Sequence, residues 1–371
     1  MRICVDIQPA LSQRAGIGRY TKYLVQHLGE FAGPDELSVF CFDFNRRGLD
    51  FAVPGARLRS VRWCPGRVAQ QAWKRLNWPP YDWFAGRADA YHFPNFTIPP
   101  LSRGKRLVTV HDMSFARHPD FAEPKNLRYL SAAIRRTVEK ADAILTDSRF
   151  SAAEIAELLN VPSDRLFPIH LGVAPEYRRP PLDDISETRR ALGLGRPYLL
   201  TVGTIEPRKN LPLLVEAFER LDDFDGDLVI AGMAGWKFEP ILARIHASPK
   251  AARIRRLSYV PDERLAGLYA GAEAFAIASF YEGFGLPPLE AMACGTPVVS
   301  SRGGSLPEIL GTAALLVEDF DAGAWAAALG RILTDTALRE RLAADGVRRA
   351  AGFTWKETAR KTWDVYRQVC S

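Results

Sequence analysis

The feature that most constrains the fold is an alternation of short apolar runs with helical stretches, which recurs in both halves of the chain. The predicted strands lie at 3–7, 37–42, 107–111, 143–146, 198–202, 228–231, 254–257 and 274–278, and all of them except 254–257 are mainly apolar. Short, continuously apolar runs are typical of parallel strands buried on both faces, with helices covering those faces. The pattern therefore predicts α/β domains, each built on a doubly wound parallel sheet.

Chain length and one proline-rich segment predict how the chain divides. A chain of 371 residues is long for one hydrophobic core and suits two domains. The segment 178–184, Arg-Arg-Pro-Pro-Leu-Asp-Asp, separates the two series of strands and is predicted to be a linker. We expect one domain over 1–180 and another over 181–352, facing each other across a cleft. Because ligands of such sheets bind at the carboxyl ends of the strands, each domain would supply one binding site.

Residues 280–301 hold the densest cluster of candidate functional groups. Two carboxylates, Glu282 and Glu290, stand on either side of the turn 283–285, whose glycines let the backbone approach a ligand. A short helix is predicted from Leu286, and a helix start beside a glycine turn is a natural anion site. Glu290 would lie inside that helix, within reach of a ribose diol, whereas Glu282 would stay on the loop, free to face a sugar. The layout predicts a sugar nucleotide; the alternative is a solvated turn before an ordinary helix.

A second cluster lies in residues 203–211, which follow a predicted strand and open a helix. Arg208 and Lys209 stand together at this helix start, one offering a planar fork and the other a compact charge. Two adjacent cations at a helix N-terminus favour a pyrophosphate ligand. The alternative is a solvated basic turn.

The segment 280–301 resembles the E-x7-E signature of the retaining family-4 glycosyltransferases, whose GT-B fold has two facing Rossmann-like domains. Glu282 and Glu290 match the two glutamates, with Gly-Phe-Gly-Leu-Pro between them and Glu-Ala-Met-Ala-Cys-Gly-Thr-Pro-Val-Val following. The resemblance covers nearly the whole chain and is more specific in the second half. It implies that the last helix, within 353–371, crosses back onto the N-terminal domain.

The resemblance also implies roles for single residues. Lys209 matches the family lysine of the diphosphate site, whereas Thr204 stands where the family has an arginine, so Arg208 would supply the second charge. The expected donor-binding residues are Gly16, Arg208, Lys209, Tyr259, Val260, Gly283, Phe284, Gly285, Leu286 and Glu290. The expected catalytic residues are Glu282, which would orient the donor sugar, and His111, which would align it with the acceptor.

The first half supplies the acceptor candidates His92, Asn95 and Ser148, together with the loop at Gly16 that would close over the donor phosphate. Each has a structural alternative. A lone histidine such as His111 or His92 is often a packed core residue, and Asn95 can serve simple packing. Ser148 matches a family serine, although a helix N-cap explains it equally well.

No metal site and no cofactor are expected. No Asp-x-Asp pair follows a strand in a cleft-forming position, and the turn at 222–225 has a poor claim to a metal. The charge of a leaving diphosphate would then be met by Arg208, Lys209 and backbone N–H groups. The five cysteines contain no Cys-x-x-Cys pair, so neither a disulfide framework nor a zinc site is indicated.

Residues 57–106 carry ten Lys and Arg against two Asp and Glu, interleaved with four tryptophans. Basic and aromatic side chains in one window favour an anionic membrane surface or a phosphate-bearing acceptor, and nucleic acid is not expected because no binding module accompanies the charge. The alternative is a solvated face with the tryptophans packed beneath it. The charged N-terminus, the lack of a long apolar run and the cysteine usage predict a cytoplasmic protein, peripheral on the inner membrane face.

We expect a glycosyltransferase that retains anomeric configuration by front-face attack, without a metal ion. The motifs at 16–20, 92–96 and 111–115 are similar to those of bacterial mannosyltransferases of surface-polysaccharide assembly, which makes GDP-mannose the expected donor and a saccharide or lipid-linked saccharide the expected acceptor. Rhamnosyl, glucosyl and N-acetylglucosaminyl donors remain alternatives.

Other classes fit less well. A sugar-nucleotide epimerase or a phosphorylase would need signatures other than the E-x7-E block. A dehydrogenase that binds NAD would need a full glycine fingerprint and an acidic residue where Cys41 and Phe42 stand. A non-catalytic protein that binds lipid surfaces explains the basic window but not Glu282 or Lys209.

Overall fold

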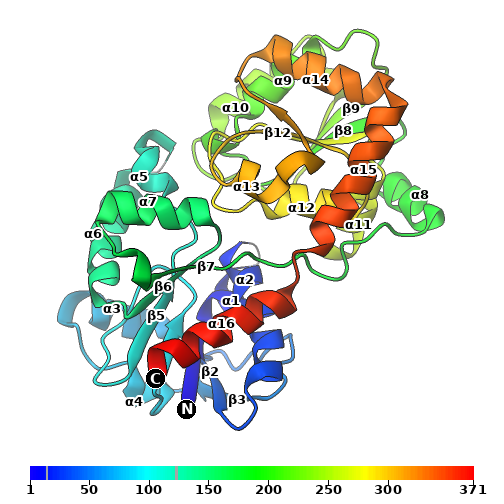
Figure 1. The fold of residues 1–371 in the computed structure, drawn as a ribbon. Helices are drawn as coiled ribbons and strands as arrows, with labels where there is room; N and C mark the ends of the chain where they lie inside the picture. The colour runs from blue at the N-terminus through cyan, green and yellow to red at the C-terminus, as the bar shows by residue number, and fades with distance from the viewer. Residues whose placement is uncertain (14–15, 122–123) are drawn as a thin grey trace. The chain divides into compact units, whose positions relative to one another are not determined.

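The computed structural model describes residues 1–13, 16–121 and 124–371, which form two compact units (Figure 1). Unit 1 consists of Met1–Ala116, Lys125–Gly172 and Thr354–Ser371, and unit 2 of Arg117–Pro124 and Val173–Phe353. The units divide after Gly172, before the expected boundary at 180. The reason is that the ring of Tyr177 is buried and lies 5.9 Å from that of Tyr269, so this stretch packs within unit 2.

Unit 1 is built on a sheet of parallel strands in the order β3-β2-β1-β4-β5-β6-β7. Its strands are β1 (Arg2–Asp6), β2 (Glu36–Phe42), β3 (Ala56–Val61), β4 (Ala90–Phe93), β5 (Lys105–Thr109), β6 (Ala143–Thr146) and β7 (Leu166–Pro168). The sequence pattern missed β3 because it is an edge strand that exposes charged side chains, Arg57 and Arg59 among them.

Unit 2 repeats the architecture with strands in the order β10-β9-β8-β11-β12-β13, all parallel. Its strands are β8 (Tyr198–Val202), β9 (Asp227–Ala231), β10 (Ile254–Leu257), β11 (Ala274–Ile277), β12 (Val298–Ser301) and β13 (Leu315–Val317). The expected class is confirmed: each unit is a doubly wound α/β domain.

Helices cover the faces of both sheets. The helices of the first half are α1 (Gln8–Ser12), α2 (Ile17–Leu28), α3 (Gly66–Leu76), α4 (Asp82–Ala85), α5 (Ser114–Arg117), α6 (Pro124–Lys140) and α7 (Arg149–Leu159). Those of the second half are α8 (Leu182–Ala191), α9 (Leu211–Glu219), α10 (Glu239–His246), α11 (Asp262–Ala270), α12 (Leu286–Ala293), α13 (Leu306–Leu310), α14 (Ala322–Thr334), α15 (Thr336–Ala351) and α16 (Trp355–Cys370). None of the helices in the described ranges is long and apolar enough to cross a membrane.

The last helix, α16, returns the chain to unit 1, where it lies along α2 (red and blue in Figure 1). Its amphipathic face buries Trp355, Trp363 and Tyr366. The ring of Trp355 stacks on Tyr23 of α2 at 5.4 Å. The C-terminal helix therefore completes unit 1, although it is far from the rest of this unit in the sequence.

Each sheet reverses its strand order once, between β1 and β4 in unit 1 and between β8 and β11 in unit 2. The loops that leave such neighbouring strands run in opposite directions and leave a crevice at the carboxyl edge of the sheet, where ligands of these folds bind. These two switch points are therefore the expected places for functional side chains.

Candidate functional site

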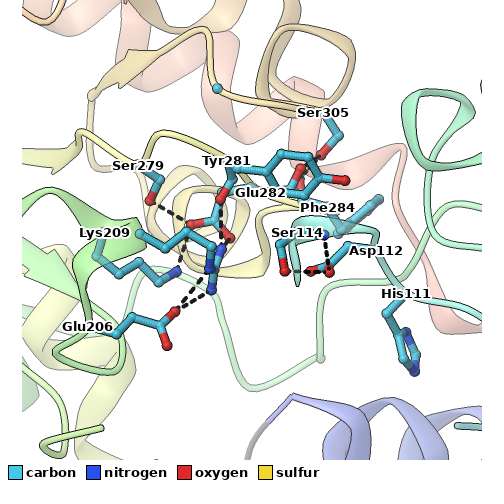
Figure 2. A network of polar contacts seen from close by, with 12 residues as sticks. His111, Asp112, Ser114, Glu206, Lys209, Ser279, Tyr281, Glu282, Phe284 and Ser305 are labelled. Atoms are coloured by element: carbon cyan, nitrogen blue, oxygen red, sulfur yellow. Dashed lines mark hydrogen bonds and ion pairs between the residues drawn. The ribbon is translucent and has the colours of Figure 1, made fainter. Parts of the chain in front are cut away.

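The switch point of unit 2 brings together the two clusters singled out in the sequence (Figure 2). The segment after β8 continues through Gly203 into a single 3-10 turn, Pro207–Lys209, that precedes α9. The segment after β11 carries Ser279 and Glu282 towards α12. A backbone hydrogen bond from the Phe280 N–H to the Arg208 carbonyl, 2.9 Å, ties the two segments together.

Glu282 is buried at the centre of this arrangement, and both of its carboxylate oxygens accept hydrogen bonds. Oε1 accepts from Lys209 Nζ and from Ser279 Oγ, each at 2.6 Å, and Oε2 accepts from Arg208 Nη1 at 2.8 Å. Burial alone would raise the pKa of this carboxyl, but the two cations and the hydrogen bonds from Lys209 and Ser279 lower it to about 2. Glu282 is thus an anion held in place, and not the free loop carboxylate that its position in the sequence suggested.

Arg208 acts as a clamp within the site. Its Nε and Nη2 donate to Glu206 Oε1 at 3.0 and 2.6 Å, and its Nη1 donates to the Tyr281 carbonyl at 2.7 Å as well as to Glu282. These bonds use all three guanidinium nitrogens on protein partners. These contacts position Glu282, and the binding of a diphosphate by Arg208 stays a prediction.

Lys209 is the cation with spare capacity towards a ligand. An ammonium carries three N–H donors, and the hydrogen bond to Glu282 uses one of them. The lysine side chain also passes close to Gly203, where an added Cβ would come within 3.2 Å of the lysine Cε. A small cavity of about 10 Å³ beside it is lined by Gly203, Lys209 and Ser279, among others.

The loop before α12 is fixed by backbone contacts that need glycine. Gly285 is the N-cap of α12 with φ of +100°, a left-handed conformation. Gly304 has φ of +66°, and a Cβ there would lie 2.3 Å from the Glu282 carbonyl oxygen. The buried Ser305 donates from its N–H and its Oγ to the same carbonyl, at 2.9 and 3.0 Å, and from Oγ to the Phe284 carbonyl at 3.0 Å. The main chain of the Glu282 loop is therefore held from two sides.

Sequence reasoning missed three polar residues of this site: Glu206, Ser279 and Ser305. The signal for Glu206 was its place two residues before Arg208, at a distance that lets a carboxylate reach the guanidinium. Ser279 and Ser305 carried no comparable signal. Serines are common in loops, and their roles here depend on contacts across the fold.

Glu290 and the loop after β10 complete the donor-binding residues expected in unit 2. Glu290 lies on α12, almost fully buried, and its Oε2 accepts a hydrogen bond from the Tyr269 hydroxyl at 2.8 Å. Tyr259 is exposed and Val260 is buried in the loop at the carboxyl end of β10. The structure thus places these three residues in unit 2, outside the ion-pair network around Glu282.

His111 lies in unit 1, just beyond the end of β5. Its Nδ1 lies 2.7 Å from Asp147 Oδ2 and its Nε2 lies 3.1 Å from the Pro94 carbonyl, while Tyr20 packs edge-on against the ring at 4.9 Å. Burial opposes protonation of the ring, but Asp147, the Pro94 carbonyl and the charge of Asp112 together outweigh it and raise the pKa of His111. A histidine with this pair of partners is oriented and favours the charged form.

The other candidates of unit 1 are placed less favourably for a direct role. His92 is fully buried in β4, with Nδ1 at 2.6 Å from the Tyr366 hydroxyl and Nε2 at 2.8 Å from Thr109 Oγ1. Burial lowers its pKa to about 3, so it is a neutral core residue beside α16, which corrects the expectation that it touches an acceptor. Ser148 is the buried N-cap of α7 and accepts a hydrogen bond from the Ser151 N–H, which is the structural alternative considered for it.

Two candidates keep a position suited to ligands. Gly16 is the N-cap of α2 with φ of +56°, and an added Cβ would meet nothing within 4 Å. Ala15, the residue before it, lies outside the described residues. Asn95 follows β4 at the switch point of unit 1 and lines two adjoining cavities. Within the described ranges no group of three or more His, Cys, Asp or Glu residues could hold a metal ion.

Comparisons with known proteins agree with this geometry. A family model described as "Glycosyl transferase 4-like domain" matches residues 15–172, and one described as "Glycosyl transferases group 1" matches residues 184–349. The chain is 33% identical to O-antigen chain mannosyltransferase B of Escherichia coli, an alignment that covers 99% of this chain and 100% of that protein.

Solved structures show the same fold. The sucrose-phosphate synthase of Thermosynechococcus elongatus has a TM-score of 0.79 at 22% identity, covering 100% of this chain and 99% of that one. Anabaena HepE in complex with UDP-glucose has a TM-score of 0.74 at 17% identity and covers 99% of each chain. With two doubly wound parallel sheets, family models over both halves and a relative matched over its full length, the chain belongs to the group 1 glycosyltransferases and has the GT-B fold.

Proposed function

We propose that the protein transfers mannose from GDP-mannose to a saccharide or lipid-linked saccharide acceptor in surface-polysaccharide synthesis, with retention of anomeric configuration. The observation that carries the proposal is the Lys209–Glu282 ion pair at the switch point of unit 2, where a positioned cation and a positioned carboxylate stand together. The mannosyl donor and the acceptor class are supported by the full-length similarity to an O-antigen chain mannosyltransferase.

In this proposal the residues of unit 2 bind the donor and stabilise the leaving group. The spare N–H donors of Lys209 bind the diphosphate, and the N–H groups at the start of α12 contribute further donors. Glu290, which also accepts a hydrogen bond from Tyr269, receives a ribose hydroxyl. Glu282 accepts from a hydroxyl of the donor sugar, while Arg208 and Ser279 keep it ionised and oriented.

The chemical step proposed is a front-face displacement. The bond between the anomeric carbon and the phosphate oxygen breaks as the acceptor hydroxyl attacks on the same face, and the departing phosphate oxygen takes the acceptor proton. Lys209 offsets the negative charge that develops on the diphosphate, so no metal ion is needed. His111, which Asp147 orients, aligns the donor sugar with the acceptor.

We also propose that unit 1 sits on the inner face of the membrane, in the cytoplasm. The tryptophans of the window 57–106 divide into two groups. Trp73 packs with Phe42 and Tyr81 and donates a hydrogen bond to the Pro79 carbonyl. It therefore belongs to the core, as expected if the tryptophans pack beneath a solvated face. Trp63, Trp78 and Trp83 are 73, 55 and 63% exposed, in a window with ten basic residues against two acidic ones, and this combination favours an anionic lipid face.

The experiment that tests the activity is an incubation of the purified protein with a panel of nucleotide sugars, followed by measurement of free nucleotide. The panel contains GDP-mannose and rhamnosyl, glucosyl and N-acetylglucosaminyl donors. We expect GDP to be released from GDP-mannose in preference to the other donors, and the release to rise when a membrane lipid extract supplies acceptors. Preferred release from another donor would reassign the sugar, and conversion of the donor into its epimer without nucleotide release would reassign the class.

A further inference from the structure

Two adjoining cavities open at the switch point of unit 1, where β1 and β4 diverge. The larger, about 530 Å³, lies between α3, the segment 95–100 and α6. The smaller, about 140 Å³, lies between α1 and the end of β4. They share the lining residues Asp6, Gln70, Asn95 and Thr97. Because the shared residues form one boundary, a single ligand can occupy both cavities.

The larger cavity is lined by cations and apolar groups. Lys74 of α3 and Arg136 and Lys140 of α6 bring three positive charges to it, against one carboxylate, Asp6. Within the described part of the chain, Arg136 and Lys140 form no ion pair with an acidic residue, so their charge is not already neutralised there. Their counterpart in a ligand is an anion such as a phosphate, which lysine and arginine both bind well.

The apolar part of the larger cavity comes from aromatic, aliphatic and proline side chains. These residues are Trp73, Phe96, Ile98, Pro99 and Pro100. The Trp73 ring is fixed by its hydrogen bond to the Pro79 carbonyl at 2.8 Å, so it is a rigid wall. A cavity that joins cations to an apolar wall suits a phosphate attached to a hydrocarbon.

The smaller cavity has the opposite chemistry. Among the described residues its lining contains no cationic side chain, and the polar lining consists of amides, hydroxyls and one carboxylate: Gln8, Ser12, Gln13, Gln70, Asn95, Thr97 and Asp6. Groups of these kinds hydrogen-bond the hydroxyls of a sugar, as both donors and acceptors. The small volume limits the saccharide to a short one.

Asp6 is the charged group at the boundary between the two cavities. It ends β1, and its Oδ1 accepts a hydrogen bond from the Gln8 N–H at 2.9 Å. A carboxylate has about four acceptor positions, so capacity remains for ligand hydroxyls. Burial raises the pKa of Asp6 to about 7, which lets the carboxyl act as an acceptor or as a donor near neutral pH.

We propose that the two cavities form one site for an acceptor whose sugar carries a phosphate at its reducing end, an inference that rests on the proposed glycosyl transfer. The sugar lies against Asp6 and Asn95, and the phosphate lies between Lys74, Arg136 and Lys140. The smaller cavity is lined by Ser12 and Gln13, close in sequence to the loop at Gly16. The sugar therefore lies beside Ser12 and Gln13, and the small volume of this cavity admits only a short acceptor.

The test is direct binding to the full-length protein, with the affinity for GDP measured separately and GDP then kept saturating. The probes are the 1-phosphates of mannose, glucose and N-acetylglucosamine, each paired with its methyl glycoside, which lacks the phosphate. We expect saturable 1:1 binding of at least one sugar phosphate, on the order of tenfold tighter than its methyl glycoside. Equal binding of the members of every pair, or no saturable binding of any sugar phosphate, would overturn the proposal.

Substitutions in each cavity test the binding of the phosphate and of the sugar separately. Arg136→Ala and Lys140→Ala should each weaken the sugar phosphate several-fold and leave the methyl glycoside unchanged. Asp6→Asn, which is nearly isosteric, should weaken both probes by the same factor. The matched control is Arg135→Ala, the neighbouring exposed arginine of α6 that does not line the cavity. A loss with Arg135→Ala as large as that with Arg136→Ala would show a diffuse charge effect and contradict the site.

A final pair of probes identifies the source of the phosphate. The best-binding sugar is attached through its phosphate to farnesol, and the affinity of this phosphodiester is compared with that of the free sugar 1-phosphate. Tighter binding of the farnesyl compound assigns the wall around Trp73 to a lipid carrier, whereas equal binding assigns the site to a soluble sugar phosphate. We expect every variant to bind GDP with the wild-type affinity, which shows that the donor site is not affected. If the proposed donor site were wrong, the wild type itself would not bind GDP.

Discussion

The ammonium of Lys209 lies 2.6 Å from Oε1 of Glu282, although 73 residues separate the two in the sequence. The strand order of unit 2 explains the contact, since β8 and β11 are neighbours in the sheet and their following loops meet at the carboxyl edge. A buried ion pair of this kind is weak evidence for stability, because desolvation of both charges opposes the attraction between them. Its value here is that it fixes a cation and an anion where a charged donor would bind.

Glu282 and Glu290 should differ in their kinetic effects. Glu282→Gln keeps the shape but removes the charge that holds Lys209 and Arg208, so we expect mainly a fall in kcat, on the order of 100-fold. Glu290→Gln alters the contact with the ribose and should mainly raise the donor KM. Steady-state kinetics at varied donor concentration separate the two. Wild-type values for both variants would show that the carboxylates are structural.

The sequence identified both halves of this pair but not their pairing. Glu282 stood out beside a glycine turn and Lys209 at a helix start that follows a strand, and local spacing suffices for both. Neither the clamp formed by Arg208 nor the salt bridge that occupies Glu282 is visible locally, because both depend on which strands become neighbours. The contacts of Arg208 with protein groups were therefore not foreseen, and its contact with a ligand stays a prediction.

Contacts between residues far apart in the sequence also explain why the surroundings of His92 and of the tryptophans could not be predicted. The sequence placed His92 near the end of a segment, whereas it lies inside β4 with a partner, Tyr366, 274 residues away. In the tryptophan window, Trp73 and Trp78 are close in sequence and alike in composition. Only the packing of α3 shows that Trp73 faces the core and that Trp78, beyond the helix end, faces solvent.

Asp6 should give the folding stability a measurable pH dependence. Burial raises its pKa from 3.8 to about 7 in the folded protein. Between about pH 4 and pH 7 the folded state therefore holds a proton that the unfolded chain has released, and the contribution of Asp6 to stability falls as pH rises. In ligand-free protein, Asp6→Asn should gain stability relative to the wild type by on the order of 1–3 kcal/mol between pH 4 and pH 8.

Urea unfolding at both pH values measures this difference. The control is Asp223→Asn, an exposed residue in a turn of unit 2, for which we expect the same change with pH as in the wild type. Parallel pH profiles for the wild type and Asp6→Asn would contradict the protonation assigned to Asp6.

Transfer activity should survive removal of divalent metal ions. The proposed mechanism meets the diphosphate charge with Lys209 and backbone N–H groups, so excess EDTA should leave the initial rate within about twofold of the untreated rate. The measurement is nucleotide release before and after chelation. Activity that disappears with EDTA and returns with magnesium or manganese would overturn this part of the mechanism.

Unit 1 should bind anionic vesicles through its exposed apolar and basic side chains. We expect co-sedimentation with phosphatidylglycerol vesicles at low salt, and weaker binding at high salt because the charges are screened. Lys74→Glu with Arg75→Glu should reduce the electrostatic part, and Leu76→Gln with Trp78→Gln the apolar part. Val347→Gln, an exposed apolar residue of α15, is the matched control for the latter pair. Equal binding to neutral and anionic vesicles, or no binding to either, would contradict the proposed contact with an anionic membrane and would show that this surface is only solvated.

If the Lys209–Glu282 pair marks the binding site of the donor diphosphate, loss of the lysine should weaken the binding of GDP, which titration calorimetry measures. We predict saturable 1:1 binding to the wild type and a loss of on the order of 10- to 100-fold in affinity for Lys209→Ala, because a desolvated charge-assisted contact contributes about 1.5–3 kcal/mol. Lys356→Ala, which removes one positive charge from an exposed position on α16, should bind GDP as the wild type does. Equal GDP affinity in Lys209→Ala and the wild type would contradict the account.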